Sequence, residues 1–225
     1  MSLTPEQQTG RERLQERGKN KVIGWEMTPE EAQTFFKSQN KVILTFLGYS
    51  GMQYENFENM LNVADRLLFH YSPETTIINI GATQVGIGLI YAMAKSRGFT
   101  TTGITSTVAL EYPDDISESV DFLCFIKDTQ WGGKLPNSTE LSPTSKAMVL
   151  CSDTLVGIGG GEIARDELLY GKELGKIVYF YPAESNYERT IHRATQMGKA
   201  KPESFWGAAH EVFENYGQHD DEPKG

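Results

Sequence analysis

The sequence has 225 residues, a formal net charge of −9, 39% hydrophobic residues and 23% charged residues, proportions typical of a globular protein with one domain. The negative charge argues against a nucleic-acid partner, because duplex binding requires clustered Lys and Arg. No apolar run approaches the about 20 residues of a membrane span, and residues 1–10 lack a signal-peptide core. We therefore expect a cytoplasmic protein without a membrane or nucleic-acid partner.

Residues 1–40 are mostly polar, and we interpret them as an N-terminal helical arm. Two segments have the Thr-Pro-x-Gln/Glu pattern of a helix start, Thr4-Pro5-Glu6-Gln7 and Thr28-Pro29-Glu30-Glu31. The second should open a short helix through Phe36. Between them, the basic residues of 11–21 are mixed with glutamates, which favours a solvated helix face over a DNA-binding arm. We expect the arm to make packing or oligomer contacts, so a homodimer is an open alternative.

The rest of the chain alternates apolar, β-rich runs with segments of helical periodicity. Predicted strands are 41–48, 75–80, 100–106, 120–126, 154–158 and 176–181. Predicted helices are 56–71, 89–96, 144–151, 162–174, 185–197 and 204–216, and residues 127–143 read as a long loop, which is often a functional lid. This alternation predicts an α/β fold with a Rossmann-like, doubly wound, mainly parallel sheet and helices on both faces. We assign it to residues 41–216, followed by a flexible tail, 217–225.

Three glycine-rich turns, 48–51, 81–88 and 159–161, each follow a predicted strand. Because the carboxyl ends of parallel strands meet at one edge, these turns should converge on one rim. The third turn leads into a helix, so its backbone N–H groups suit a phosphate. The alternative is that its glycines only allow a tight turn. Candidate nucleotide-binding residues are Gly48, Ser50, Gly51, Gly81, Thr83, Gln84, Gly86, Thr105, Ser106, Gly159, Gly160, Gly161 and Glu162.

Several familiar signatures are absent from the sequence. It contains no Gly-x-Gly-x-x-Gly, and Ile87 and Gly88 replace the Lys and Ser/Thr of a P-loop, which argues against an ATPase. No serine-hydrolase elbow is present either. Cys124 and Cys151 sit in apolar stretches without metal-ligand spacing, and we expect buried thiols in a reducing compartment. We therefore predict neither a metal site nor a cofactor.

Two segments resemble the nucleotide-contacting motifs of the SLOG superfamily, which includes the "Lonely guy" phosphoribohydrolases and the lysine-decarboxylase-like proteins. Residues 81–104 resemble the first motif, and residues 145–168, with the run Gly-Gly-Gly-Glu-Ile-Ala-Arg-Asp-Glu, resemble the second. The resemblance covers roughly residues 41–182. It implies a Rossmann-like fold and a nucleotide site at the glycine turns.

The second motif departs from the family pattern Pro-Gly-Gly-x-Gly-Thr-x-x-Glu. Gly159 replaces Pro, Ile163 replaces the third Gly, and Ala164 replaces the Thr that touches phosphate. Ser145 stands where the phosphoribohydrolases have a catalytic Arg. The resemblance implies that Glu167 is the catalytic carboxyl group, acting on the ribose side as a nucleophile or as a stabiliser of oxocarbenium-like charge. It also makes Lys146, which the family keeps, a second catalytic candidate, with Lys146 or Arg165 as the local cation that could replace the Arg.

Three hypotheses follow from these observations. The first is a protein that binds a nucleotide or a nucleotide-derived ligand at the glycine-rich rim. The second is a nucleoside 5'-monophosphate phosphoribohydrolase, which releases the base and ribose 5-phosphate by N-glycosidic cleavage. The third is a degenerate, non-catalytic interaction module.

Overall fold

The computed structural model describes residues 11–17 and 20–214, which form one eight-stranded sheet in the order β1-β2-β6-β5-β4-β3-β7-β8. β1 pairs antiparallel with β2, and every other neighbouring pair is parallel. The predicted α/β fold with a mainly parallel sheet is confirmed. The strands are β1 (Arg11–Arg17), β2 (Asn20–Met27), β3 (Val42–Gly48), β4 (Thr76–Ile80), β5 (Thr100–Ser106), β6 (Phe122–Ile126), β7 (Thr154–Ile158) and β8 (Ile177–Tyr181).

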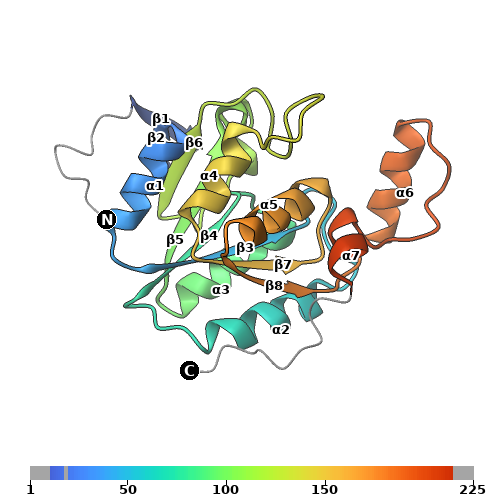
Figure 1. Cartoon of the computed structure of the whole chain (residues 1–225), viewed down its shortest axis with the longest axis horizontal. Coiled ribbons are helices and arrows are strands. Elements are labelled where there is room, and N and C mark those ends of the chain that lie inside the picture. Colours follow the sequence, from blue (N-terminus) through green and yellow to red (C-terminus); the bar gives the residue numbers. More distant parts are fainter. Residues whose placement is uncertain (1–10, 18–19, 215–225) are drawn as a thin grey trace.

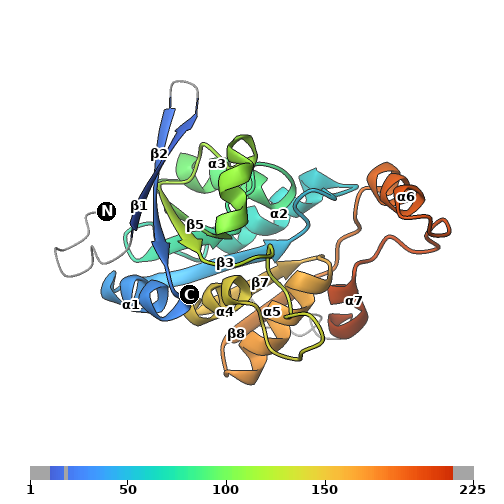
Figure 2. The same cartoon turned by 90° about the horizontal axis from the view of Figure 1, so that it is seen from above.

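Helices cover both faces of the sheet, as Figure 1 and Figure 2 show. α2 (Phe57–Leu68) and α3 (Ile90–Ser96) pack on one face. The other face is covered by α1 (Pro29–Ser38), α4 (Pro143–Cys151), α5 (Glu162–Glu173) and the short α7 (Ala208–Phe213). The central strands β3, β4, β6 and β7 are mainly apolar because both of their faces are buried.

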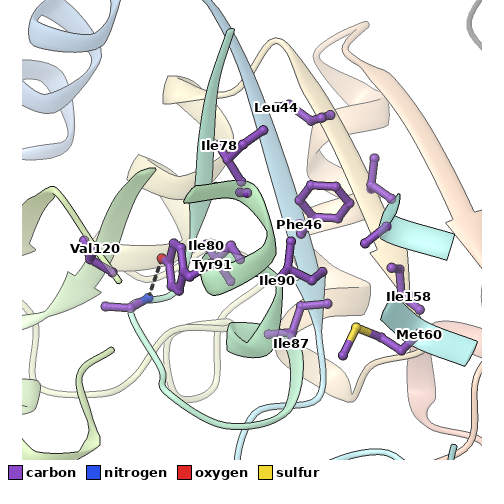
Figure 3. Close-up of a cluster of buried hydrophobic side chains, with 14 of the residues drawn as sticks. Leu44, Phe46, Met60, Ile78, Ile80, Ile87, Ile90, Tyr91, Val120 and Ile158 are labelled. Carbon is purple, nitrogen blue, oxygen red and sulfur yellow. Dashed lines mark hydrogen bonds between the residues drawn. The ribbon is translucent and has the colours of Figure 1, made fainter. Parts of the chain in front are cut away.

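The alternation of side chains along each strand divides the core into two clusters. On β3, Leu44 and Phe46 face α2 and α3, whereas Ile43 and Leu47 face the α1–α4–α5 layer. Figure 3 shows the first cluster, in which Ile87, Ile90 and Tyr91 pack against strand residues such as Ile78, Ile80 and Ile158. The buried Tyr91 hydroxyl accepts a hydrogen bond from the Ala82 N–H (3.2 Å) and donates one to the Thr102 carbonyl (2.9 Å). These bonds fix the end of β4 against β5.

The prediction of a helical arm before residue 41 is wrong over residues 11–27, which form the hairpin β1–β2. β2 joins the sheet through parallel pairing of Gly24–Met27 with β6, so the predicted domain boundary at residue 41 does not separate this segment from the sheet. The backbone of Gly24 lies so close to β6 that an added Cβ would be 2.4 Å from the Phe125 ring. Edge strands are often rich in charge, which explains why the composition of residues 11–21 resembled a solvated helix face. The predicted start at Thr4 lies outside the described residues.

The second predicted helix start is confirmed at α1. Thr28 is the N-cap, and its hydroxyl accepts a hydrogen bond from the Glu31 N–H at 3.2 Å. The Glu31 carboxylate in turn accepts one from the Thr28 N–H at 2.8 Å. These reciprocal bonds form a capping box, which fixes where the chain leaves β2 and enters the helix.

The last two predicted helices are shorter than expected, at α6 (Tyr187–Gln196) and α7. α6 has no buried residue, and in both Figure 1 and Figure 2 it stands away from the sheet. The predicted tail, 217–225, lies outside the described residues. Within the described part of the chain, no helix has the length and apolar character needed to cross a membrane.

Candidate functional site

The three glycine turns lie together at the carboxyl ends of β3, β4 and β7, as predicted. The Ile87 N–H in the second turn donates to the Tyr49 carbonyl in the first turn at 2.7 Å. An added Cβ on Gly160, in the third turn, would lie 3.5 Å from the Gly48 Cα. These contacts join three turns that are far apart in the sequence into one rim.

Most glycines of this rim are required by the packing of the chain itself. A Cβ on Gly48 would lie 2.0 Å from the Tyr54 hydroxyl oxygen, and a Cβ on Gly86 would lie 2.2 Å from the Tyr49 carbonyl oxygen. Gly160 has a φ of +121° and leaves only 2.6 Å between its added Cβ and Ala164. At these positions the simpler interpretation, a tight turn, is sufficient.

Three other glycines have open space where a side chain would be. A Cβ added to Gly51, Gly81 or Gly161 would meet no atom within 4 Å. None of the three has a positive φ, so their own backbone geometry does not demand glycine. A glycine that no neighbour requires leaves the backbone open to close approach by a ligand.

The amino end of α5 is the part of this rim best suited to an anion. Gly161 is the N-cap and supplies no side-chain capping bond. Among the described residues, no acceptor takes a hydrogen bond from the N–H groups of residues 161–164. Free N–H groups at the positive end of a 12-residue helix attract negative charge. The exposed carboxylate of Glu162 lies on the same turn and opposes a second anion.

The crevice between β3 and β7, where the strand order reverses, is filled by Tyr49 and Tyr54. The Tyr54 hydroxyl donates to the Ile158 carbonyl at 2.7 Å and accepts from the Tyr49 N–H at 3.1 Å. The Tyr49 hydroxyl donates to the Ala183 carbonyl at 3.3 Å. Burial raises the pKa of both phenols. Open α/β sheets usually bind ligands in this crevice, so a ligand here must lie above the tyrosines. Only the aromatic residue inside the first glycine turn signalled this in the sequence.

Several predicted ligand residues are engaged by the chain. The Gln84 N–H donates to the Asp115 carbonyl at 3.0 Å, and Thr83 forms a β-bridge with Ile116. At the end of β5, the buried Ser106 hydroxyl donates to the Asp128 carbonyl at 3.3 Å. Thr105 is also buried, whereas Ser50 is exposed.

Glu167 is buried on α5 and belongs to a hydrogen-bond chain with α4 and the 127–143 loop. The Ser145 hydroxyl donates to Glu167 Oε1 at 2.6 Å and accepts from the Gly133 N–H at 2.7 Å. Burial raises the pKa of Glu167 to about 8; the negative charge of Asp166 adds to this rise, and the Ser145 hydrogen bond opposes it. Sequence reasoning found Glu167 but missed its pairing with Ser145.

The second predicted catalytic residue, Lys146, is not brought to Glu167. Its ammonium group pairs with the Glu30 carboxylate of α1 at 2.8 Å, on the exposed side of α4. Arg165 pairs with Asp166 (Nε–Oδ1, 2.9 Å). Neither local cation is therefore placed as a substitute for the family's Arg.

The 127–143 loop packs over the buried carboxyl group. Its Lys134 ammonium lies 3.4 Å from Asp166 Oδ1, and a Cβ added to Gly132 would be 2.9 Å from the Ser145 hydroxyl oxygen and 3.8 Å from Glu167 Oε1. Asp128, at the start of the loop, accepts a hydrogen bond from the Thr144 N–H at 3.0 Å. The loop thus lies at the carboxyl ends of β5 and β6, where a lid would have to be.

Other candidate features lie away from this rim. Cys124 and Cys151 are buried, as expected, and burial raises the pKa of both thiols. Within the described residues, no group of His, Cys, Asp and Glu side chains has the arrangement of a metal site. A small hollow beside α2 contains none of the predicted site residues. It is lined by Val63, Arg66, Leu67, His70 and Tyr181.

No family model and no curated protein matches the chain. Among solved structures, it is similar to the Moco carrier protein of Chlamydomonas reinhardtii (22% identity, TM-score 0.46, covering 77% of this chain and 96% of that one). It is also similar to a molybdenum cofactor binding protein of Rippkaea orientalis (16%, 0.44, 78% and 96%). A third match is DNA processing protein A of Streptococcus pneumoniae (14%, 0.44, 80% and 63%). All three similarities have identities below 25% and TM-scores below 0.5. At this level of similarity, any inference about a ligand must come from the geometry of the chain itself.

Proposed function

We propose that the chain binds a nucleotide or a nucleotide-derived ligand at the glycine-rich rim, with a phosphate at the amino end of α5. The observation that carries this proposal is the set of N–H groups at residues 161–164, which have no acceptor among the described residues. Gly161 leaves the space in front of them open. Four free donors and a helix dipole at one point are the usual elements of a phosphate site.

The neighbouring turns support a ligand longer than a phosphate. Gly51 and Gly81 leave open space at the ends of β3 and β4, next to the turn that precedes α5. Tyr49 and Tyr54 close the sheet below this region. We therefore place the ligand across the rim, over the three glycine turns.

The experiment is a comparison of Gly161→Ala with the native protein. Because Gly161 has a negative φ (−86°) and open space, alanine should leave the fold intact while its methyl group fills part of the open space at the amino end of α5. The ligands to titrate are AMP, GMP and the molybdenum cofactor, which appears in the names of two of the similar proteins. Isothermal titration calorimetry should detect binding of at least one of them to the native protein. The variant should bind it at least about 10-fold more weakly, a loss of about 1.4 kcal/mol.

Glu162→Gln should change the ligand affinity in the opposite direction. Removing an exposed carboxylate from the first turn should strengthen the binding of an anionic ligand by about two- to fivefold, corresponding to about 0.3–1 kcal/mol. A thermal-shift panel gives the first screen, since a ligand at 100 times its Kd adds about 2.7 kcal/mol of stability. If no nucleotide shifts the Tm of the native protein at millimolar concentration, the proposal is wrong and the interaction-module hypothesis gains.

One observation favours the phosphoribohydrolase as a second candidate. Glu167, with a pKa of about 8, holds a proton at neutral pH, as a general acid must. Gly132 and Ser145 cover it, so the 127–143 loop would have to open before the carboxyl reached a substrate. Incubation with AMP should then release adenine, and Glu167→Gln should abolish the release. Adenine release that survives the substitution would exclude Glu167 from the mechanism.

A further inference from the structure

Two exposed aromatic side chains stand together beside the proposed phosphate site. Trp131, in the 127–143 loop, is 50% exposed, and Tyr112, at the end of the 3-10 helix η3 (Thr107–Glu111), is 48% exposed. Their ring centroids are 5.7 Å apart, and the ring planes are inclined at 44°. Both residues are therefore about half exposed, and the pair leaves aromatic surface free for a third ring.

Trp131 differs in this respect from the other two tryptophans. Trp25 stacks on Phe122 with an interplanar angle of 12°, and Trp206 stacks on His210 at 20°. In both cases a neighbouring ring of the chain occupies one face of the indole. The tilted contact with Tyr112 does not cover the Trp131 ring in this way.

Contacts connect the aromatic pair to the amino end of α5. Added Cβ atoms on Gly132 and Gly133 would lie 3.3 Å from the side chain of Ile163, which belongs to the first turn of α5 and is 41% exposed. Trp131 thus precedes a segment that touches the helix turn proposed to hold phosphate. The exposed side chain of Ile163 therefore links the segment after Trp131 to the amino end of α5.

The charges around Tyr112 indicate which end of a ligand would lie there. Glu111, Asp114 and Asp115 are all exposed and would repel a phosphate. Carboxylates accept hydrogen bonds, so they favour a ring that carries N–H donors. The Tyr112 segment also pairs with the second glycine turn through Gln84 and Asp115, which places it on the same rim.

We infer that Trp131 and Tyr112 form the platform on which the planar, N–H-bearing heteroaromatic ring of the ligand stacks, as in a purine or a pterin. This inference rests on the proposed function, because it takes the phosphate at α5 as the other end of the ligand. Stacking on an aromatic side chain tolerates different ligand rings. Trp131 and Tyr112 therefore supply affinity for aromatic ligands in general, while the carboxylates favour rings with amino groups.

The test uses AMP together with ribose 5-phosphate, which has the phosphate end but no base. Trp131→Ala should weaken AMP binding by about 10- to 100-fold and leave ribose 5-phosphate binding, measured by titration calorimetry, unchanged. AMP should also quench the fluorescence of the native protein. In Trp131→Phe, this quench should disappear while the AMP affinity stays within about threefold of the native value, because phenylalanine still offers a ring. Trp206→Phe is the matched control and should keep both the affinity and the quench.

Two results would overturn the inference while the proposed function stands: unchanged AMP affinity in Trp131→Ala, or an equal loss for AMP and ribose 5-phosphate. In the second case Trp131 would support the loop instead of contacting the base. If no nucleotide of the thermal-shift panel and no ribose 5-phosphate binds the native protein, the proposed function fails and the inference fails with it. Circular dichroism of each variant confirms that it is folded.

Discussion

Replacing Glu167 with Gln should remove most of the pH dependence that this buried carboxyl gives to the stability of the fold. Burial raises the pKa of Glu167 from its ordinary value of 4.5 to about 8. The folded protein therefore keeps the proton at pH values where the unfolded chain loses it. The contribution of Glu167 to stability is fully present below about pH 4.5 and decreases as the pH rises toward about 8.

The size of the effect follows from these two pKa values. At pH 7 the unfolded chain has lost the proton almost completely, and the folded protein has kept most of it. Proton linkage then lowers the free energy of unfolding by about 3 kcal/mol relative to acidic solution. Glutamine has the same shape, accepts the Ser145 hydrogen bond and does not titrate. The free energy of unfolding of the variant should therefore not decrease in this way as the pH rises.

Urea unfolding at several pH values from about 5.5 to about 8 measures the effect. The difference in unfolding free energy between the native protein and Glu167→Gln should change by about 3 kcal/mol across this range, in favour of the variant at high pH. Glu173→Gln, at an exposed position on the same helix, is the control and should follow the native protein. Parallel curves for native protein and Glu167→Gln would refute the reasoning, because they would mean that Glu167 is ionised in the fold.

Four other substitutions test the geometry of the rim and of its surroundings. Gly160→Ala should lower the free energy of unfolding by at least about 2 kcal/mol, because the φ of +121° and the 2.6 Å contact with Ala164 leave no room for a side chain. Gly161→Ala should change the free energy of unfolding by less than about 1 kcal/mol. Equal Tm values for the two variants would contradict the assignment of open and closed glycines. Tyr54→Phe should cost about 1–3 kcal/mol in urea unfolding, since the Ile158 carbonyl loses its buried donor; a cost below about 0.5 kcal/mol would mean that another donor replaces it. Lys146→Met should change stability by less than about 1 kcal/mol, because the exposed pair with Glu30 is weak, and should leave AMP affinity intact; loss of AMP binding would return Lys146 to the site.

The strands of the central sheet could be predicted because their chemistry is local. Each is an apolar, β-rich run bounded by turn residues, and every predicted run from residue 41 onward forms a strand. The hairpin β1–β2 could not be predicted in this way. Its pairing with β6 depends on residues that are about 100 positions away, and its composition carries charge.

The site was predictable only in outline. The convergence of three glycine turns follows from the parallel sheet, and Glu167 was identified from its motif. The orientation of neighbouring side chains was not predictable from the motif alone. Consecutive residues of a helix point to different faces, so Ser145 of α4 bonds Glu167 while Lys146 pairs with Glu30 of α1.

The sequence by itself therefore determined the α/β class, the order of the strands from β3 to β8 along the chain, and the place of the glycine turns, because local pattern and chain connectivity set these. Only the tertiary structure decided which glycines are open. Gly160 and Gly161 are adjacent and alike in sequence, but Ala164 crowds the first and nothing crowds the second. The difference lies in contacts and backbone angles, and a string of glycines does not encode them locally.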